Sequence, residues 1–172
     1  MTDSPQGKQN VRSFVEAAAD PVGTIYIDRW DEGVRFVVLR GPSALCAYIG
    51  VPVGHPLAGH SYNDLPVNAH GGLTYAGSGV TGLEDAGLYW YGWDYGHAGD
   101  RLLFSLDSRF STLHMGDEEW TPSAVDSDSW EVLYDFHGLM RLAESIATRS
   151  GAALRAFDHQ AIPDKEDSDD RR

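Results

Sequence analysis

The sequence contains a single cysteine, Cys46, among its 172 residues. One thiol cannot form an intramolecular disulfide, and it cannot supply the several thiolates of a cysteine-ligated metal cluster. A secreted domain held together by disulfides is therefore excluded. Cys46 lies in an apolar run, where a cysteine is more often a small core residue than a reactive thiolate.

Basic residues are scarce, because 13 Lys and Arg stand against 26 Asp and Glu, which gives a formal net charge of -13. Nucleic-acid binding draws its affinity from Lys and Arg that neutralise phosphates. Direct binding to DNA or RNA is therefore disfavoured. The final residues, 163–172, carry a run of these acidic groups, which we expect to be a solvated tail.

Long apolar runs are also missing, since no stretch approaches the roughly 18 residues of a membrane-spanning helix. Residues 1–9 are polar and lack the apolar centre of a signal peptide. We therefore expect a cytoplasmic protein that does not contact a membrane.

The length of the chain and its apolar content of 42% suit one folded domain. We expect residues 1–10 to form a flexible N-terminal arm, residues 11–162 to form the domain, and residues 163–172 to form a disordered acidic tail.

Runs of β-branched and aromatic residues predict several strands. The predicted strands are 23–28, 34–40, 44–51, 72–76, 88–95 and 101–106, and the first two form a hairpin joined by residues 29–33. Residues 11–19 predict a short helix, and helical spacing of apolar residues from Trp130 to a stop at Gly151 predicts a long one. The pattern indicates an α+β single domain, in which a mainly antiparallel sheet packs against a long C-terminal helix.

Residues 88–100 are the most informative segment. Strand alternation places Tyr89, Tyr91, Trp93 and Tyr95 on one face, and it places Asp94 beside Trp90 on the other. A partly buried carboxylate at position 94 must be hydrogen-bonded, paired or metal-bound. The alternative, which we weigh equally, is that Asp94 and Asp100 cap turns and that His97 is an ordinary loop histidine.

A second polar segment precedes the strand predicted at 72–76. His70 lies at the start of that strand, and Thr74 points to the same side. Gly71 and Gly72 would let a ligand or another backbone come close, although a plain Gly-Gly turn capped by the histidine explains them equally well. Phosphate-loop and dinucleotide-binding signatures are absent.

Together these segments define a candidate site between Gly50 and Asp100, a region that holds most of the 19 glycines and four of the 7 histidines. The candidate catalytic and metal-ligating residues are His70, Asp94, His97 and Asp100, because imidazole and carboxylate groups bind the divalent metals that activate water. The candidate ligand-binding residues are His55, Tyr62, Gly71, Gly72, Thr74, Tyr75 and Trp90. The histidines at 55 and 60 match no specific zinc spacing.

Three motifs resemble a known family: CAYIGVP with GHP at 46–56, HGGLTY at 70–75, and GWDYGHAGD at 92–100. They are similar to those of a family of small uncharacterised proteins found in bacteriophages and bacterial genomes, and the resemblance covers about residues 44–147. Where this chain has Trp93 and Tyr95, that family leads us to expect Phe and Cys, so no site thiolate is implied here. The resemblance implies a phage or prophage origin and brings no activity with it.

Three functions stay open. The first is a binding or inhibitory protein that acts on a host protein or a small molecule, with Trp30, Trp90 and Trp93 as exposed anchors. The second is a metal-assisted hydrolase that acts on a nucleotide or phosphoester, with a divalent metal as its only implied cofactor. The third is a structural or interaction domain whose glycines and histidines only shape loops. The oligomeric state is left undetermined.

Overall fold

The computed structural model describes residues 12–84, 87–106 and 116–158. Its elements, in chain order, are α1 (Phe14–Ala19), β1 (Ile25–Asp31), β2 (Val34–Arg40), β3 (Leu45–Pro52), β4 (Tyr75–Gly77), β5 (Leu88–Asp94), β6 (Gly99–Asp100), β7 (Gly116–Glu118) and α2 (Pro122–Asp158). Two short 3-10 turns, Tyr62–Asp64 and Leu103–Leu106, lie between them. The arm predicted at 1–10 and the tail predicted at 163–172 lie outside the described residues.

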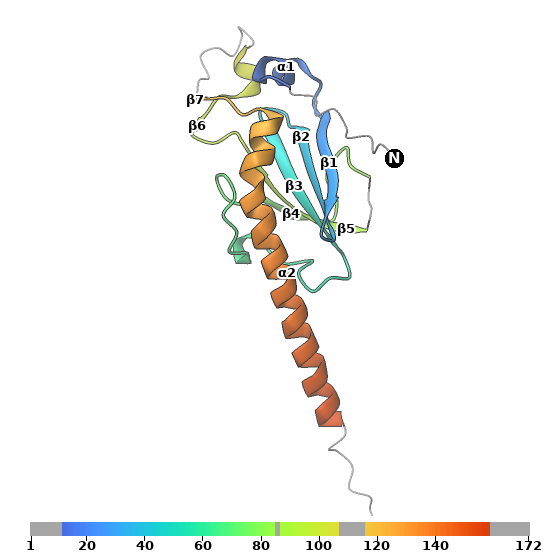
Figure 1. Cartoon of the computed structure of the whole chain (residues 1–172). Coiled ribbons are helices and arrows are strands. Elements are labelled where there is room, and N and C mark those ends of the chain that lie inside the picture. The colour runs from blue at the N-terminus through green and yellow to red at the C-terminus, as the bar shows by residue number, and fades with distance from the viewer. Residues whose placement is uncertain (1–11, 85–86, 107–115, 159–172) are drawn as a thin grey trace, which may run out of the picture.

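Five strands form one antiparallel sheet in the order β1-β2-β3-β5-β4. The long helix α2 lies across one face of this sheet and extends well beyond it (Figure 1). The predicted α+β class, with an antiparallel sheet against a long C-terminal helix, is confirmed. None of the described helices is both long enough and apolar enough to cross a membrane.

The β1–β2 hairpin closes more tightly than expected. Arg29 to Asp31, which we predicted to be part of the loop, pair with β2, so only Glu32 and Gly33 are left for the turn. Both have left-handed φ angles, +42° and +88°. A two-residue turn of this kind matches the twist of the flanking strands, which lets the ladder continue to the turn.

Glycines opposite aromatic rings shape the centre of the sheet. Tyr48 on β3 pairs with Gly92 on β5, and Gly50 pairs with Trp90. A Cβ on Gly92 would come within 2.6 Å of the Tyr48 ring, and a Cβ on Gly50 would come within 2.9 Å of the Trp90 ring. The two glycines therefore make room for rings that lie across the neighbouring strand.

The predicted alternation along β5 is confirmed. Tyr91, Trp93 and the following Tyr95 are buried in the main core, which includes Phe136 of α2. Trp90 is buried in a second, smaller cluster on the other face of the sheet. Trp90 and Trp93 are 0% and 1% exposed, so the expectation that they serve as exposed anchors is wrong, while Trp30 is 59% exposed. Their apolar area stabilises the sheet instead.

The long helix begins earlier and ends later than the sequence pattern predicted. It starts at Pro122. The preceding residue, Thr121, caps the helix, because its hydroxyl oxygen accepts a hydrogen bond from the Ala124 N–H at 3.2 Å. Proline suits the first helical position, because its missing N–H needs no partner there. The helix continues through Gly151, the predicted stop, to Asp158. One glycine costs a helix only about 1 kcal/mol, which the rest of α2 can offset.

The strand predicted at 101–106 is wrong. Leu103–Leu106 form a 3-10 turn instead. Leu102 and Leu103 are adjacent and both buried, whereas successive residues of a strand with one solvent-exposed face would alternate between buried and exposed. The short strands β6 and β7, which the pattern did not predict, pair in parallel on either side of this turn. This small ribbon holds Asp100 beside the main sheet.

Candidate functional site

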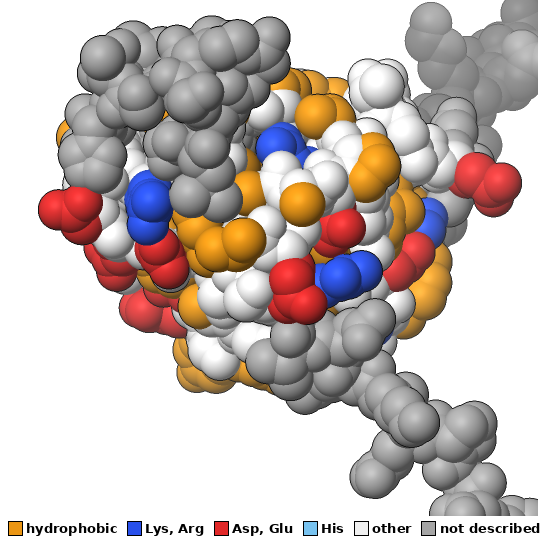
Figure 2. Space-filling view, turned by 90° about the horizontal axis from the view of Figure 1, so that it is seen from above, with side chains coloured by type: hydrophobic (Ala, Val, Ile, Leu, Met, Phe, Trp, Pro, Cys, Tyr) orange, Lys and Arg blue, Asp and Glu red, His pale blue; other side chains and the backbone are white. Residues whose placement is uncertain are grey.

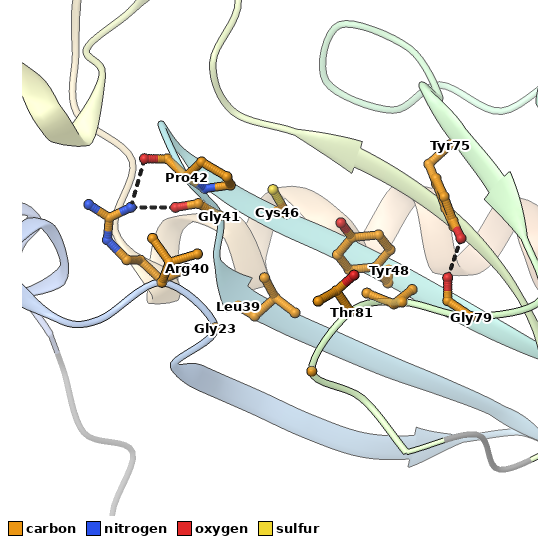
Figure 3. Close-up of a pocket in the computed structure, with 13 residues that line it drawn as sticks. Gly23, Leu39, Arg40, Gly41, Pro42, Cys46, Tyr48, Tyr75, Gly79 and Thr81 are labelled. Atoms are coloured by element: carbon orange, nitrogen blue, oxygen red, sulfur yellow. Dashed lines mark hydrogen bonds between the residues drawn. The ribbon is translucent and has the colours of Figure 1, made fainter.

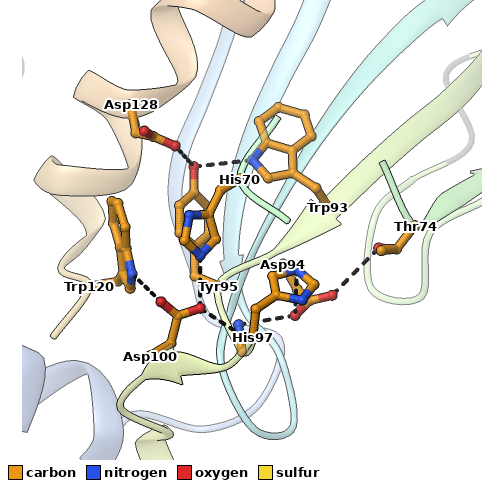
Figure 4. A network of polar contacts seen from close by, with 10 residues as sticks. His70, Thr74, Trp93, Asp94, Tyr95, His97, Asp100, Trp120 and Asp128 are labelled. Atoms are coloured by element: carbon orange, nitrogen blue, oxygen red, sulfur yellow. Dashed lines mark hydrogen bonds and ion pairs between the residues drawn. The ribbon is translucent and has the colours of Figure 1, made fainter. Parts of the chain in front are cut away.

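Two segments bring the four candidate catalytic residues into one region (Figure 4). His70 stands just before β4, whereas Asp94 ends β5 and is followed by His97 and Asp100. Because β4 and β5 are antiparallel neighbours, the approach to β4 lies beside the exit from β5. His70 Nε2 lies 2.8 Å from Asp100 Oδ2, and the rings of His70 and His97 are 5.5 Å apart.

Asp100 is the most firmly held of the four. Its side chain accepts hydrogen bonds at 2.8 Å from the His97 backbone N–H and from Trp120 Nε1, besides its contact with His70. Burial favours the neutral acid, but these bonds outweigh burial and hold the pKa of Asp100 below its usual value. Both carboxylate oxygens are therefore already engaged within the protein.

The imidazole of His70 is fixed by aromatic rings as well as by Asp100. It stacks on Tyr95 with ring centroids 4.8 Å apart and an interplanar angle of 9°. The Trp120 ring lies equally close, at 4.8 Å. A carboxylate that orients a half-buried imidazole is the arrangement found in general bases. Among the described residues, no serine, threonine or cysteine side chain is hydrogen-bonded to His70.

Tyr95 carries the network on to α2. Its hydroxyl donates to Asp128 Oδ2 at 2.8 Å and accepts from Trp93 Nε1 at 3.1 Å. Burial, the larger effect, and the neighbouring Asp128 raise the pKa of Tyr95. The phenol therefore stays neutral and links the sheet to the helix.

Sequence reasoning missed three residues of this network: Tyr95, Trp120 and Asp128. Tyr95 was grouped correctly with Tyr91 and Trp93 on one face of the strand, but strand alternation does not say what its hydroxyl meets. Trp120 and Asp128 lie 20 and 33 residues further along the chain than the groups they bond, Asp100 and Tyr95. No local pattern reports a contact over that separation.

Asp94 and His97 form a looser pair beside this network. Asp94 Oδ1 accepts the Gly96 N–H at 3.0 Å, whereas it lies 3.8 Å from His97 Nε2. Thr74 Oγ1 lies 3.5 Å from Asp94 Oδ2. Both Asp94 and Asp100 accept a backbone N–H two or three residues away, which is the turn-capping behaviour that we weighed as the alternative.

The close approach expected at Gly71 is made by the protein itself. A Cβ on Gly71 would lie 2.0 Å from His97 Nε2. That nitrogen is buried and has no hydrogen-bond partner among the described residues. Gly71 and Gly72 both have left-handed φ angles, so the pair forms a tight turn that fits under the histidine.

Metal binding receives no support from this geometry. Within residues 12–84, 87–106 and 116–158, no three His, Cys, Asp or Glu side chains are grouped so that they could hold a metal ion. His70 Nε2 is directed at Asp100, and both oxygens of Asp100 accept other donors. A metal would have to displace those bonds before it gained its own ligands.

The remaining candidate ligand-binding residues do not join this cluster. His55 accepts the Leu57 N–H at 3.0 Å, and its other ring nitrogen lies 3.1 Å from Glu144 Oε1, so it ties a loop to α2. Tyr62 packs against the main core. Tyr75 lines a pocket on the opposite face of the sheet, and Trp90 is fully buried. The predicted ligand-binding residues therefore do not form one site.

Two cavities lie elsewhere on the molecule, and neither is lined by His70, Asp94, His97 or Asp100. One lies between a loop and α2, and the other lies on the sheet face opposite α2. No protein-family model, curated protein or solved structure matches the chain.

Proposed function

We propose that this chain is a binding protein whose partner is another protein, docked by an amphipathic helix on the outer part of α2. The observation that carries the proposal is a groove of about 410 Å³ between α2 and the loop at 56–65. Its apolar lining includes Leu57, Leu65, Leu139, Leu142, Ala143 and Ile146.

Apolar side chains of α2 line this groove at a spacing that suits contact with a partner helix. Leu142 and Ile146 lie one turn apart on α2, and each is 51% exposed. Amphipathic helices bind grooves of this kind through side chains that repeat every three or four residues. A large apolar side chain left half in water gains free energy when a partner covers it.

The helix itself supports an external partner. Between Met140, which is buried, and Gly151 no residue of α2 is buried, and the helix continues to Asp158 without a sheet beneath it (Figure 1). Most of the stability of a helix in a protein comes from packing of its apolar face against other elements. A partner that packs against the part of α2 after Met140 would therefore stabilise it.

Charge selects the kind of partner. The chain has a formal net charge of -13, and Asp64 lines the groove. In the view from above, Lys and Arg side chains are scattered singly among acidic and hydrophobic ones (Figure 2). A basic amphipathic helix would be steered toward such a surface, whereas a second copy of this chain would be repelled. A host protein is one of the partners that the sequence left open, and we propose it as the source of that helix.

The experiment uses a fluorescently labelled synthetic helix that carries leucines on one face and lysines on the other. Its binding is followed by fluorescence anisotropy. Leu142→Glu and Ile146→Glu should each weaken binding about thirtyfold, the effect of a 2 kcal/mol interface anchor. Val15→Glu is the matched control, because Val15 is similarly exposed, at 60%, but lies on α1.

Two results would overturn the proposal. One is binding that is absent, or that is equally strong in all the variants. The other is a dimer in analytical ultracentrifugation that Leu142→Glu converts to a monomer, because the groove would then be covered by a second copy.

The metal-assisted hydrolase is the second candidate, and the His70–Asp100 pair is the observation that favours it. An oriented imidazole supplies a general base, but the engaged oxygens of Asp100 weigh against a metal at that place. Calorimetric titration with divalent metals separates this candidate from the binding protein.

A further inference from the structure

A second pocket, of about 520 Å³, lies on the sheet face opposite α2 (Figure 3). Strands β2, β3 and β4 form its floor, and the glycine-rich loop at 79–82 forms its outer wall. Sites for small molecules in proteins enclose about 300–1,000 Å³. The volume therefore suits a small organic ligand.

No charged group of the described residues points into this pocket. Of the described residues that line it, only Arg40 has a charged side chain. Arg40 follows Leu39 on β2, so the two side chains point to opposite faces of the sheet. The guanidinium donates to the carbonyls of Gly41 and Pro42, and to that of Ala18, which packs against the main core on the α2 side. The pocket therefore offers no partner to a charged ligand.

Two ionisable side chains of the pocket stay neutral near pH 7. Burial, with a smaller contribution from Asp94, raises the pKa of the Cys46 thiol to about 11. Burial likewise raises the pKa of Tyr48. A charged ligand would lose its hydration here without gaining an opposite charge, which is unfavourable. These surroundings select a neutral ligand.

Aromatic and aliphatic side chains line the middle of the pocket. Tyr48 and Tyr75 meet edge to face with ring centroids 5.9 Å apart. Leu39 and Val80 are buried and belong to the same small hydrophobic cluster as the two tyrosines. A flat ring that displaces water from such side chains gains free energy, and it can meet the tyrosine rings in the same edge-to-face manner.

The two tyrosine hydroxyls differ in what they can offer a ligand. The Tyr75 hydroxyl already donates to the carbonyl of Gly79 (Figure 3). The Tyr48 hydroxyl is hydrogen-bonded to the thiol of Cys46, and sulfur is a weak acceptor. A hydroxyl or carbonyl oxygen of a ligand would be a stronger partner for Tyr48. The pocket can therefore hold one polar group at that place.

We infer that this pocket binds a neutral aromatic molecule that carries one hydroxyl or carbonyl group. The ring lies between Tyr48, Tyr75 and Val80, and the polar group replaces the thiol as the partner of the Tyr48 hydroxyl. The inference goes beyond the proposed function, because the pocket shares no lining residue with the groove on α2 and lies on the other face of the sheet.

The probes are 2-naphthol and 2-naphthoate, which share one ring system but of which only the second is charged at pH 7. NMR titration of the full chain follows their binding. We expect 2-naphthol to shift the backbone amides of Thr81 and Gly82, and its ring protons to show NOEs to the methyl groups of Leu39 and Val80. The naphthoate should bind at least about thirtyfold more weakly, because its carboxylate would be buried without an opposite charge.

Tyr48→Phe tests the hydrogen bond to the ligand. The substitution keeps the ring and removes the hydroxyl, so 2-naphthol should bind about fivefold more weakly. Tyr134→Phe is the matched control and should leave the affinity unchanged, because Tyr134 is 73% exposed on α2 and does not line the pocket. Both variants keep the apolar contacts of the ring, so both proteins should fold.

Any of four results would contradict the inference. Absence of amide shifts and NOEs at millimolar 2-naphthol would mean that the pocket does not bind the ring. Binding of 2-naphthoate as tight as that of 2-naphthol would mean that the pocket does not select a neutral ligand. Equal affinities of Tyr48→Phe and Tyr134→Phe would remove the hydrogen bond. Binding that Leu142→Glu abolishes would assign the probe to the groove on α2.

Discussion

The imidazole of His97 occupies the space in which a side chain of residue 71 would begin, because a Cβ on Gly71 would lie 2.0 Å from His97 Nε2. Gly71 also has a φ of +65°, a conformation that other residues adopt at a cost of about 1–2 kcal/mol. The turn before β4 and the loop after β5 are thus fitted to each other.

Gly71→Ala should lower the free energy of unfolding by more than Gly72→Ala, because it adds a steric clash to the cost of the left-handed φ. Gly72 has a φ of +87° but nothing within 4 Å of its Cβ position, so it is the matched control for backbone strain alone. Urea denaturation should show a difference of at least about 1 kcal/mol between the two variants. Equal losses would mean that His97 moves aside freely.

Asp100→Asn should destabilise the protein by about 2–3 kcal/mol near pH 7, since it weakens charge-assisted hydrogen bonds to a buried group. Because the folded pKa of Asp100 lies below its unfolded value of about 3.9, the stability that its charge supplies is present above that value. This stability is lost as the pH falls through the folded pKa.

The difference in stability between the unmodified protein and Asp100→Asn should therefore shrink below about pH 4. Thermal melts from pH 7 down to pH 2.5 would measure it. Asp94→Asn is the control, because the Asp94 side chain is 37% exposed and should cost under about 1 kcal/mol. A difference that stays constant with pH would show that the charge of Asp100 does not stabilise the fold.

Calorimetric titration with zinc, manganese and magnesium tests the hydrolase candidate. We expect no heat of binding at the His70–Asp100 cluster, because the oxygens of Asp100 are engaged and no three ligands are grouped in the described residues. Binding that His97→Ala or Asp94→Asn removes, with hydrolysis lost and the fold intact, would instead support the metal-assisted enzyme.

Glu32→Asn should stabilise the β1–β2 hairpin by about 0.5–1 kcal/mol, because Asn tolerates the φ of +42° better than Glu does. Glu32 lies 3.9 Å from His137 Nδ1 and 4.0 Å from an Arg141 nitrogen, but its own side chain is 70% exposed, and ion pairs of so exposed a carboxylate at these distances contribute little. A rise in melting temperature would confirm the strain at Glu32. A fall would show that those pairs matter more than the turn.

Some features of this protein follow from the sequence alone. Successive side chains of an extended backbone point to opposite faces, so the spacing of Tyr91, Trp93 and Tyr95 was enough to place them together on one face. The structure shows that this face belongs to the main core. The antiparallel sheet and the C-terminal helix followed from similarly local patterns. Local patterns did not give the ends of α2, because the polar residues that follow Thr121 can stand either before a helix or on its exposed side.

The tertiary structure alone decided which polar groups meet. His70 and Asp100 are 30 residues apart, and Trp120 reaches Asp100 from beyond β7. Which residues of β5 share a face could be predicted from a period of two, but the partner of a given carboxylate depends on strand register and on the path of every loop between. The same holds for Arg40, whose guanidinium meets the carbonyls of Ala18, Gly41 and Pro42 only once β2, α1 and the 41–42 turn are packed together.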